Sequence, residues 1–429
     1  MNNFYEEKWQ ALEAEVNRRG GDGREVVAAI KELYSNFDDG AVEWLASLYD
    51  PDIGGFYFSE SARDNEEIEY DGRVSKLLPD IESTEQATNF LQSSKMISSF
   101  DEVPSWMRDK MAEFICSCED PETGYFYHPQ WGKEYTDTKL ARRGRDLMWA
   151  EDMADKFNFK LPYPTANERL RKTKEEKVGN DTAENVLPDY LLSEEAFMEH
   201  LKSYDWDHRE YWSGNRMAAQ ATQVKAAGLG DVAVKFLNSI QDPETGLWGK
   251  TGGYDSINAF LKISCFYRSV GHSVPHVEKA VRTCLECINS TDHPIHVCTT
   301  YNNWFSIHNI LLDLRNFGGD EGKAKADEIS KELLLAAPEA IRSTARKVKI
   351  FKKKEGCFSY CENNTSGTSQ GMPVAIFGTN EGDINANGIC STGTVAFMFR
   401  ALELEDYKIP LFSPNAYDKF LAALKRPTK

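Results

Sequence analysis

Residues 236–268 read FLNSIQDPETGLWGKTGGYDSINAFLKISCFYR and place a turn between two helical patterns. The turn is Asp242-Pro243-Glu244-Thr245-Gly246. Pro243 presets its φ and Gly246 can adopt a positive φ, so the turn is chemically specified. A second helix is predicted from about Asp255, a residue type that suits an N-cap. The stretch therefore predicts a helix–turn–helix unit.

This turn recurs along the chain. Asp120-Pro121-Glu122-Thr123-Gly124 is identical to it, and Asp50-Pro51 followed by Gly54-Gly55 is a close variant. Weaker copies occur at 204–230, 287–318 and 350–360, and such self-similarity is typical of repeat architectures. We therefore predict six turn-plus-helix units. Their second helices are expected to open near Asp80, Asp137, Asn215, Asp255, Tyr301 and Asn387.

Composition excludes several classes of function. The chain has 429 residues, 41% of them apolar, which is enough for a large core. The formal net charge of −18 disfavours binding to a phosphate backbone, so no nucleic-acid partner is expected. No apolar run approaches the roughly 18 residues that a membrane span requires, so no membrane association is expected.

The cysteine content indicates a cytoplasmic location. Nine cysteines, an odd number in an irregular distribution, favour free thiols in a reducing compartment. The N-terminal stretch is a charged amphipathic helix and does not resemble a signal peptide. No linker divides the chain, so residues 1–429 are predicted to form a single domain. Two polar stretches, 158–190 and 361–383, are expected as loop excursions, and a lid is one interpretation of the first.

The repeated hairpins resemble the α/α-toroid group. This group includes terpenoid cyclases, protein prenyltransferases, and many glycoside hydrolases, polysaccharide lyases and sugar epimerases. The segment from Gln241 to Gly249 is similar to the glutamine–tryptophan repeat of terpenoid cyclases, and Asp50 to Phe56 resembles the turn before an inner helix in sugar epimerases. The resemblance implies an all-α (α/α)6 toroid, in which the N-terminal ends of the second helices open on a cavity.

The expected cavity carries acids, arginines, amides and aromatic rings, a mixture that binds sugars. A terpene site would instead be apolar, and the acidic motifs Asp-x-Asp-Asp and Asp-Asp-x-x-Asp do not occur in the chain. Glycoside hydrolysis needs one carboxyl that protonates the leaving oxygen and a second that activates water or attacks. We therefore predict a glycoside hydrolase that acts on a small oligosaccharide, with Glu82, Asp255 and Asp383 as catalytic residues.

Substrate-binding residues are predicted at the same helix starts. Arg142 and Arg145, one turn apart, can bind a substrate carboxylate, which would suit a uronic-acid sugar. The other interpretation is a surface ladder with acidic neighbours. The tryptophans are either core plugs or sugar-stacking platforms. The predicted set is His128, Trp131, Asp137, Arg142, Arg145, Trp248, Tyr301, Asn302, Trp304 and His308.

The sequence leaves other functions open. A lyase or an epimerase would use a neutralising Asn or Arg with a Tyr or His base, and Tyr301, Asn302 and His308 supply those types on one element. A terpenoid-cyclase-like protein and a non-catalytic helical-repeat scaffold are further alternatives. Cys284 and Cys287 have zinc-like spacing, but they are expected to pack on an outer helix, so we predict no metal and no other cofactor. The oligomeric state is not predicted.

Overall fold

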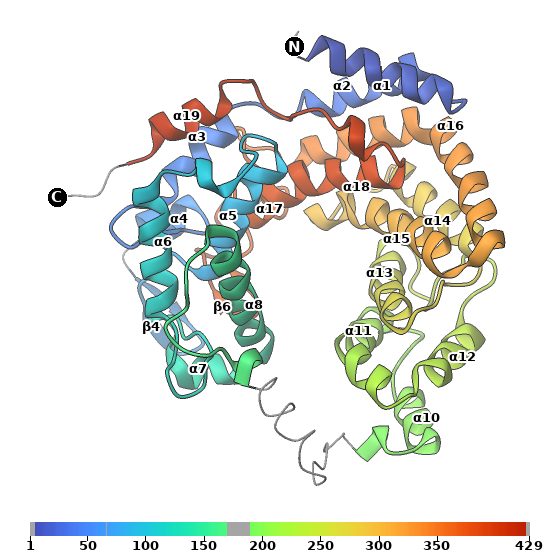
Figure 1. The fold of residues 1–429 in the computed structure, drawn as a ribbon, viewed down its shortest axis with the longest axis horizontal. Helices are drawn as coiled ribbons and strands as arrows, with labels where there is room; N and C mark the ends of the chain where they lie inside the picture. The colour runs from blue at the N-terminus through green and yellow to red at the C-terminus, as the bar shows by residue number, and fades with distance from the viewer. Residues whose placement is uncertain (1–4, 66, 170–188, 426–429) are drawn as a thin grey trace.

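The computed structural model describes residues 5–65, 67–169 and 189–425. These residues form mainly helices, together with three antiparallel two-stranded ribbons (Figure 1). The all-α prediction is therefore confirmed at the level of fold class. Within the described ranges, no helix is both long enough and apolar enough to cross a membrane. Most of the predicted excursion at 158–190 lies outside the described residues.

One set of helices, here called the inner helices, packs in series around the centre of the molecule (Figure 1). Each contacts the next along the series, and two short helices joined by a π-helical turn at Ile389–Gly393 act as one member. In spatial order the series is α8 (Leu140–Phe157), α5 (Ile81–Ser93), α17 (Ile384–Gly388) with α18 (Thr394–Ala401), α15 (Asn302–Phe317), α13 (Gly253–Val270) and α11 (Glu210–Ala226).

The remaining long helices lie outside this series, and a continuous apolar core fills the space between the two sets. They are α1 (Glu6–Arg18), α2 (Gly23–Tyr34), α3 (Gly40–Ser47), α6 (Ser105–Ser117), α10 (Glu194–Lys202), α12 (Gly230–Ile240), α14 (Val277–Asn289), α16 (Gly319–Phe351) and α19 (Ala416–Ala423). Shorter elements connect them: α4 (Glu60–Asp64), α7 (Gly132–Thr138), and the ribbons β1 (Tyr49–Asp50) with β2 (Gly55–Phe56), β3 (Ile68–Tyr70) with β4 (Arg73–Ser75), and β5 (Thr368–Ser369) with β6 (Met372–Pro373).

The three Asp-Pro turns share one hydrogen-bond pattern. In each turn the aspartate carboxylate accepts the backbone N–H two residues later, at 3.0 Å for Asp50, 3.1 Å for Asp120 and 2.9 Å for Asp242. The aspartate carbonyl also accepts the glycine N–H four residues later, at 2.8 Å in all three turns. The predicted repetition of a chemically specified turn is therefore confirmed.

The turn glycine also explains how one hairpin meets the next. Gly246 has a φ of 71°, and a Cβ added there would lie 2.5 Å from the backbone nitrogen of Ala280 in α14. Thr283 of the same helix donates to the carbonyl of Thr245 at 2.8 Å. Only glycine permits both the positive φ and this close approach. The turn therefore docks directly against the following outer helix.

One predicted inner-helix start, at Asp80, is confirmed by its cap, whereas α17 begins at Ile384 after the cap Asp383, before the predicted Asn387. Asp80 caps α5 by accepting the N–H of Ser83 at 3.1 Å, and Asp383 caps α17 by accepting the N–H of Ala386 at 2.7 Å. Such caps satisfy backbone donors that have no partner inside the helix. Tyr301 precedes α15 as predicted, although its side chain makes no capping bond.

Three other starts differ from the prediction. α8 begins at Leu140, because Asp137 belongs to the separate short helix α7. α11 begins at Glu210, before the predicted Asn215. α13 begins at Gly253 after the positive-φ residue Gly252, so Asp255 lies inside the first turn and is not the N-cap. None of these three helices has a side-chain hydrogen bond at its N-cap, so no polar cap marks where it begins.

Candidate functional site

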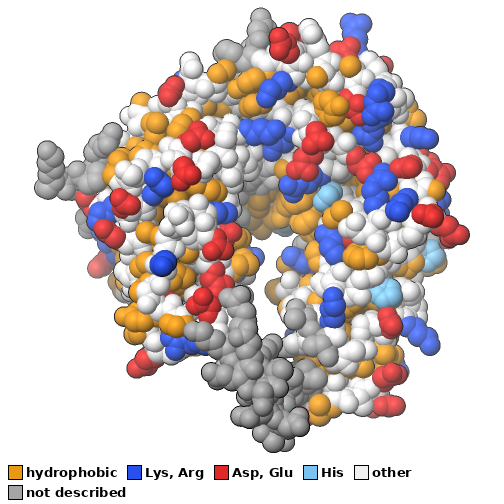
Figure 2. Space-filling view, in the orientation of Figure 1, with side chains coloured by type: hydrophobic (Ala, Val, Ile, Leu, Met, Phe, Trp, Pro, Cys, Tyr) orange, Lys and Arg blue, Asp and Glu red, His pale blue; other side chains and the backbone are white. Residues whose placement is uncertain are grey.

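The N-terminal ends of several inner helices meet through direct contacts. α5 and α8 are joined by Asp80 and Arg142 at 2.6 Å, and α13 and α15 by Tyr254 and Asn302 at 2.7 Å. The space-filling view shows an opening between the α8 side of the molecule and the side formed by α11 and α13 (Figure 2). We call this opening the central hollow, and its two sides differ in chemistry.

One side of the hollow is a cluster of ion pairs, here called the ionic wall: Asp80, Glu82, Arg142, Arg145 and Asp146. Arg142 is fully buried and pairs with Asp80 at 2.6 Å, Asp146 at 2.8 Å and Glu82 at 3.1 Å. Arg145 is 42% exposed and pairs with the second oxygen of Glu82 at 2.8 Å. Glu82 is thus held between two guanidinium groups, of which only that of Arg145 is open to solvent.

Aromatic and backbone contacts fix the ionic wall in place. The guanidinium carbon of Arg142 lies 4.5 Å from the centre of the Trp131 ring, and the His128 ring lies 4.6 Å from the same indole. His128 Nε2 is 2.7 Å from the carbonyl of Pro79, and burial lowers the pKa of this histidine to about 4. Burial also raises the pKa of Asp146 to about 7, against the opposing effect of Arg142. Trp131 therefore packs on Arg142, and His128 bonds to the backbone beside Asp80, so both residues hold the ionic wall in place.

The other side is built from four tyrosines, here called the tyrosine wall: Tyr211, Tyr254, Tyr301 and Tyr360. They come from α11, α13, the start of α15 and the loop before α17. Cys298 lies among them, with its sulfur 3.8 Å from the hydroxyl of Tyr360. Burial raises the pKa of Tyr254, and nearby Cys298, Tyr301 and Tyr360 add to the rise. The phenols therefore remain protonated at neutral pH.

The charge of Arg145 links the two walls. Burial raises the pKa of Tyr301 and of Tyr211, and in both cases the positive charge of Arg145 opposes the rise. Arg145 belongs to α8, so its charge reaches across to the ends of α11 and α15. The hydroxyls of Tyr211 and Tyr301 make no hydrogen bond to any described residue. Two phenolic donors and one guanidinium are therefore available to a ligand at this place.

A histidine that the sequence analysis did not assign to the site adjoins the tyrosine wall. His296 lies 5.4 Å from Tyr360 in a stacked arrangement and 5.3 Å from Tyr254 edge-on, measured between ring centres. Burial lowers the pKa of His296, and Asp255 partly offsets this. The imidazole is therefore neutral near pH 7 and can accept a proton.

Among the three predicted catalytic carboxyls, only Glu82 is part of either wall. Asp383 is fully buried, and its oxygens accept from Ala386, Tyr360 and Thr365 within 3.0 Å, so it acts as a helix cap and loop anchor. Burial raises the pKa of Asp383 to about 6. Asp255 is exposed in the first turn of α13. The structure therefore does not join these three residues into one carboxylate constellation.

The predicted tryptophan platforms separate into different environments. Trp248 and Trp304 are fully buried, and their indole nitrogens donate to the Leu237 carbonyl at 2.9 Å and the Thr344 hydroxyl at 3.0 Å. These two residues are core plugs, which was the other interpretation of the sequence. Trp131 is also buried, but it lies between the ionic wall and a small surface cavity considered below.

The other predicted binding residues are spread over a wider area. Asn302 bonds to Tyr254 in the tyrosine wall. Asp137 lies on α7 and pairs with Arg143 of α8 at 2.7 Å, so it is not part of the ionic wall. His308, two turns into α15, lies 6.1 Å from the Phe397 ring, and burial lowers its pKa to about 4. The Tyr301 ring lies 5.8 Å from the same Phe397 ring.

The sequence carried only weak signals for the residues it missed. Tyr254 is adjacent to the predicted Asp255, and only the observed helix register shows that the tyrosine joins the wall. Tyr211 and Tyr360 come from segments far apart in sequence, with no spacing motif. Ser369 of β5 donates to Glu82 at 2.8 Å from within the predicted polar excursion.

The described residues contain no group of three or more His, Cys, Asp and Glu side chains placed to hold a metal ion. Cys284 is buried on α14 and Cys287 is partly buried on the same helix, and burial raises the pKa of both thiols. All nine cysteines are free thiols, as predicted.

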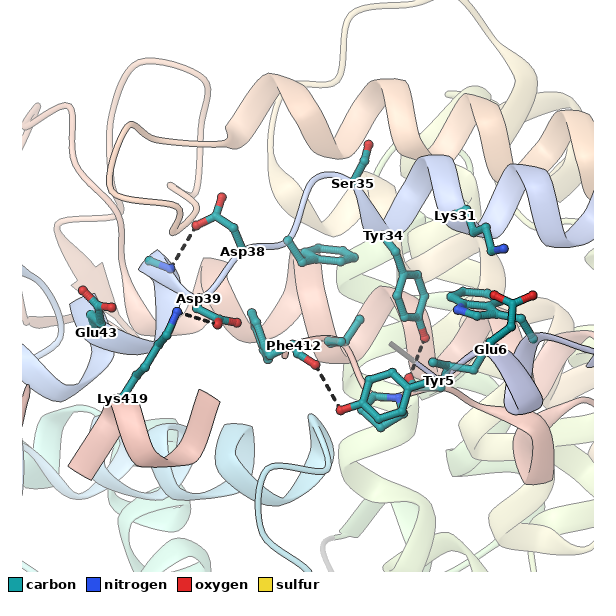
Figure 3. Close-up of a pocket in the computed structure, with 16 residues that line it drawn as sticks. Tyr5, Glu6, Lys31, Tyr34, Ser35, Asp38, Asp39, Glu43, Phe412 and Lys419 are labelled. Carbon is teal, nitrogen blue, oxygen red and sulfur yellow. Dashed lines mark hydrogen bonds and ion pairs between the residues drawn. The ribbon is translucent and has the colours of Figure 1, made fainter. Parts of the chain in front are cut away.

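A cavity of about 690 Å³ lies away from the hollow, between α2 and the C-terminal segment that precedes α19 (Figure 3). Its polar groups bond to one another across that seam. Tyr34 donates to the Ile409 carbonyl at 2.8 Å, Tyr5 to the Phe412 carbonyl at 3.3 Å, and Asp39 pairs with Lys419 at 2.9 Å. These bonds fasten the C-terminal segment to the N-terminal helices, so we assign this cavity a structural role.

Comparison with protein-family models, with curated proteins and with solved structures found no match for the chain. Its function must therefore be argued from the hollow itself.

Proposed function

We propose that the inner helices form an (α/α)6 toroid and that the central hollow is the active site of an enzyme that cleaves an acidic oligosaccharide by elimination. The single observation that supports this most is the electrostatic proximity of Arg145 to Tyr211 and Tyr301, where its positive charge opposes the burial that raises the pKa of both phenols. It places an accessible guanidinium near phenols whose hydroxyls have no partner in the described protein. The effect of the Arg145 charge in α8 on Tyr211 in α11 also supports closure of the helix series into a ring.

Each group has a chemical role in this proposal. Arg145 would pair with the substrate carboxylate, which makes the proton on the adjacent carbon more acidic. His296, neutral at working pH, would take that proton. The bond from the next carbon to the leaving sugar oxygen then breaks, and its place is taken by a carbon–carbon double bond. Tyr301, protonated at neutral pH, would give its proton to the leaving oxygen.

Hydrolysis by paired carboxylates is the second candidate. Glu82 favours it because its carboxylate accepts a hydrogen bond from Arg145, the partly exposed cation of the ionic wall. It needs a second carboxyl about 5 to 10 Å away that holds a proton. Asp383 is engaged by three internal hydrogen bonds, and Asp255 is exposed in the first turn of α13, outside both walls. We therefore place elimination before hydrolysis.

The test is product analysis on acidic oligosaccharides of galacturonate, glucuronate and mannuronate, with neutral oligosaccharides beside them. Elimination leaves an unsaturated sugar end that absorbs ultraviolet light, whereas hydrolysis does not. Tyr301→Phe, His296→Ala and Arg145→Gln should each lower the rate by about 100-fold or more, because each removes one proton-transfer or charge-stabilising group. Tyr267→Phe, which removes a buried hydroxyl bonded to Asn238 outside the hollow, is the matched control.

Saturated products with a new reducing end would transfer the assignment to hydrolysis and to Glu82. No cleavage of any oligosaccharide in the panel would overturn the enzymatic proposal in favour of a binding scaffold.

A further inference from the structure

A second cavity, of about 270 Å³, adjoins the ionic wall through Trp131. It lies between the β3–β4 ribbon and α7, and Tyr70, Arg73, Gln130 and Tyr135 contribute to its lining. Its volume suits a single sugar ring or a group of similar size. Aromatic rings and hydrogen-bonding side chains line it together, as they do the hollow.

Two positively charged side chains lie at this cavity, although the chain as a whole has a negative net charge. The guanidinium carbon of Arg73 lies 4.5 Å from the centre of the Tyr135 ring, and the ammonium of Lys139 lies 5.2 Å from the same ring. Neither cation forms an ion pair within the described residues, in a protein of net charge −18. Asp71 accepts a hydrogen bond from the Tyr135 hydroxyl at 3.1 Å and forms no ion pair with either cation in the described part of the chain.

Aromatic surface is also presented beside the cations. Tyr70 stacks on Phe377 with ring centres 5.3 Å apart and an interplanar angle of 10°, and Phe377 is 54% exposed. The exposed Phe377 and the half-buried Tyr70, near two cations without carboxylate partners among the described residues, suit a ligand that has both a flat apolar face and an anionic group. A sugar ring with a carboxylate has both features.

We propose that this cavity is a subsite for one uronate unit of the substrate chain, with Arg73 as the residue that determines specificity for its carboxylate. The planar guanidinium of Arg73 can donate two parallel hydrogen bonds to the carboxylate, and Lys139 adds a second positive charge. The sugar ring then packs on the aromatic surface of Tyr70. This subsite rests on the proposed function, because it serves a chain whose scissile bond lies in the hollow.

The β5–β6 ribbon connects the subsite with the hollow. Ser369 on β5 bonds to Glu82, and Pro373 on β6 lines the subsite. The carbonyl of Pro373 also accepts the side-chain amide of Gln130 at 3.1 Å, which ties the ribbon to the segment before α7. A substrate that extends from the ionic wall over this ribbon therefore reaches Arg73.

The experiment uses the full chain and measures binding and cleavage separately. Binding is measured by calorimetry with the trisaccharides of galacturonate, glucuronate and mannuronate, and with the methyl ester of whichever of the three binds most tightly. Arg73→Gln should weaken binding of the acidic trisaccharide by about tenfold or more and should not affect the ester. Arg24→Gln, at an exposed arginine on α2 without an ion pair in the described structure, should leave both unchanged.

Cleavage gives the second readout. Arg73→Gln should raise KM for trisaccharides and longer chains while kcat and disaccharide cleavage stay unchanged, as expected for a residue remote from the broken bond. Equal KM values for Arg73→Gln and wild type would overturn the subsite and leave the elimination proposal standing. Binding that depends on Arg73 without any cleavage would overturn the elimination proposal and retain the cavity as a uronate site. Absence of acidic trisaccharide binding to wild type would overturn the subsite.

Discussion

The ionic wall and the tyrosine wall are linked by the charge of Arg145 but are stabilised in opposite ways. In the ionic wall, Arg142 has three carboxylate partners inside the protein, and all of its charge is compensated there. In the tyrosine wall, Tyr211 and Tyr301 carry hydroxyls with no hydrogen bond to the described chain. The first wall therefore satisfies its charges within the fold, whereas the second retains bonding capacity that folding does not use.

This difference suggests that the ionic wall serves stability and the tyrosine wall serves ligand binding. Buried charges must be paired internally, because an unpaired one costs several kcal/mol. Hydroxyls at the edge of a hollow can remain bonded to water until a ligand replaces it. Arg145 belongs to both patterns, since it pairs with Glu82 and yet is 42% exposed. Mutations in the two walls should consequently separate stability from binding.

The largest effect is expected when Arg142 is replaced. Arg142→Met leaves Asp80, Glu82 and Asp146 buried without their shared cation, and should lower the free energy of unfolding by about 3 to 5 kcal/mol. Urea denaturation followed by circular dichroism measures this loss. The control is Arg143→Met, which breaks a partly exposed pair with Asp137 and should cost less than about 1 kcal/mol. Similar losses in both variants would contradict the special role of Arg142.

A smaller, pH-dependent effect is expected at Glu85, which borders the ionic wall on α5. Burial raises the pKa of Glu85 to about 7, although Lys156 opposes this. The folded protein therefore binds this proton more tightly than the unfolded chain does, and the stability it contributes is lost as pH rises from about 5 through 7. The slope should approach about 1.4 kcal/mol per pH unit for one proton.

Urea denaturation at several pH values checks this slope. Glu85→Gln should lower the total slope by this one-proton share, because glutamine does not titrate but can still bond to Asn89 and Lys156, while Asp146 and Asp383 keep their own contributions. Glu321→Gln, at an exposed position on α16, is the control and should leave the pH profile as in wild type. A wild-type profile that is unchanged by Glu85→Gln would contradict the assignment.

Within the tyrosine wall, Tyr254 should matter more to stability than its neighbours. Asn302 donates to the Tyr254 hydroxyl at 2.7 Å, so Tyr254→Phe leaves a buried amide with one fewer partner. The expected cost is about 1 to 2 kcal/mol by thermal or urea unfolding. Tyr254→Phe combined with Asn302→Leu and Asn258→Leu should recover part of this loss, since Asn302 also donates to Asn258 at 3.1 Å and all three polar partners are then removed. No recovery in the triple variant would argue against a direct coupling of these residues.

The smallest effect is expected at Tyr301. Its hydroxyl has no hydrogen bond in the described protein, so Tyr301→Phe should change stability by less than about 0.5 kcal/mol. The same variant should lose most cleavage activity under the proposed mechanism. A large loss of stability would show that the hydroxyl serves the fold and would erase the contrast between the walls.

Much of the architecture could be predicted from local chemistry. The Asp-Pro-x-x-Gly turns specify their own hydrogen bonds, and the N-cap Asp80 marks the start of its helix. The site was less predictable, because an Asp or Glu at a helix start can be a cap, an ion-pair partner or a free acid. Asp383 is a cap, Glu82 is a double ion-pair partner, and Asp255 is exposed, although all three appear equivalent in sequence.

The sequence by itself determined the repeated turn, the helix–turn–helix units and the predominance of helices, because each depends on residues within a few positions of one another. Only the tertiary structure decided which side chains meet: Arg142 with Asp80, Arg145 near Tyr211 and Tyr301, and His296 against Tyr360. Those encounters join residues that are tens to more than a hundred positions apart. Their distances depend on how the helices stack, which no local pattern encodes.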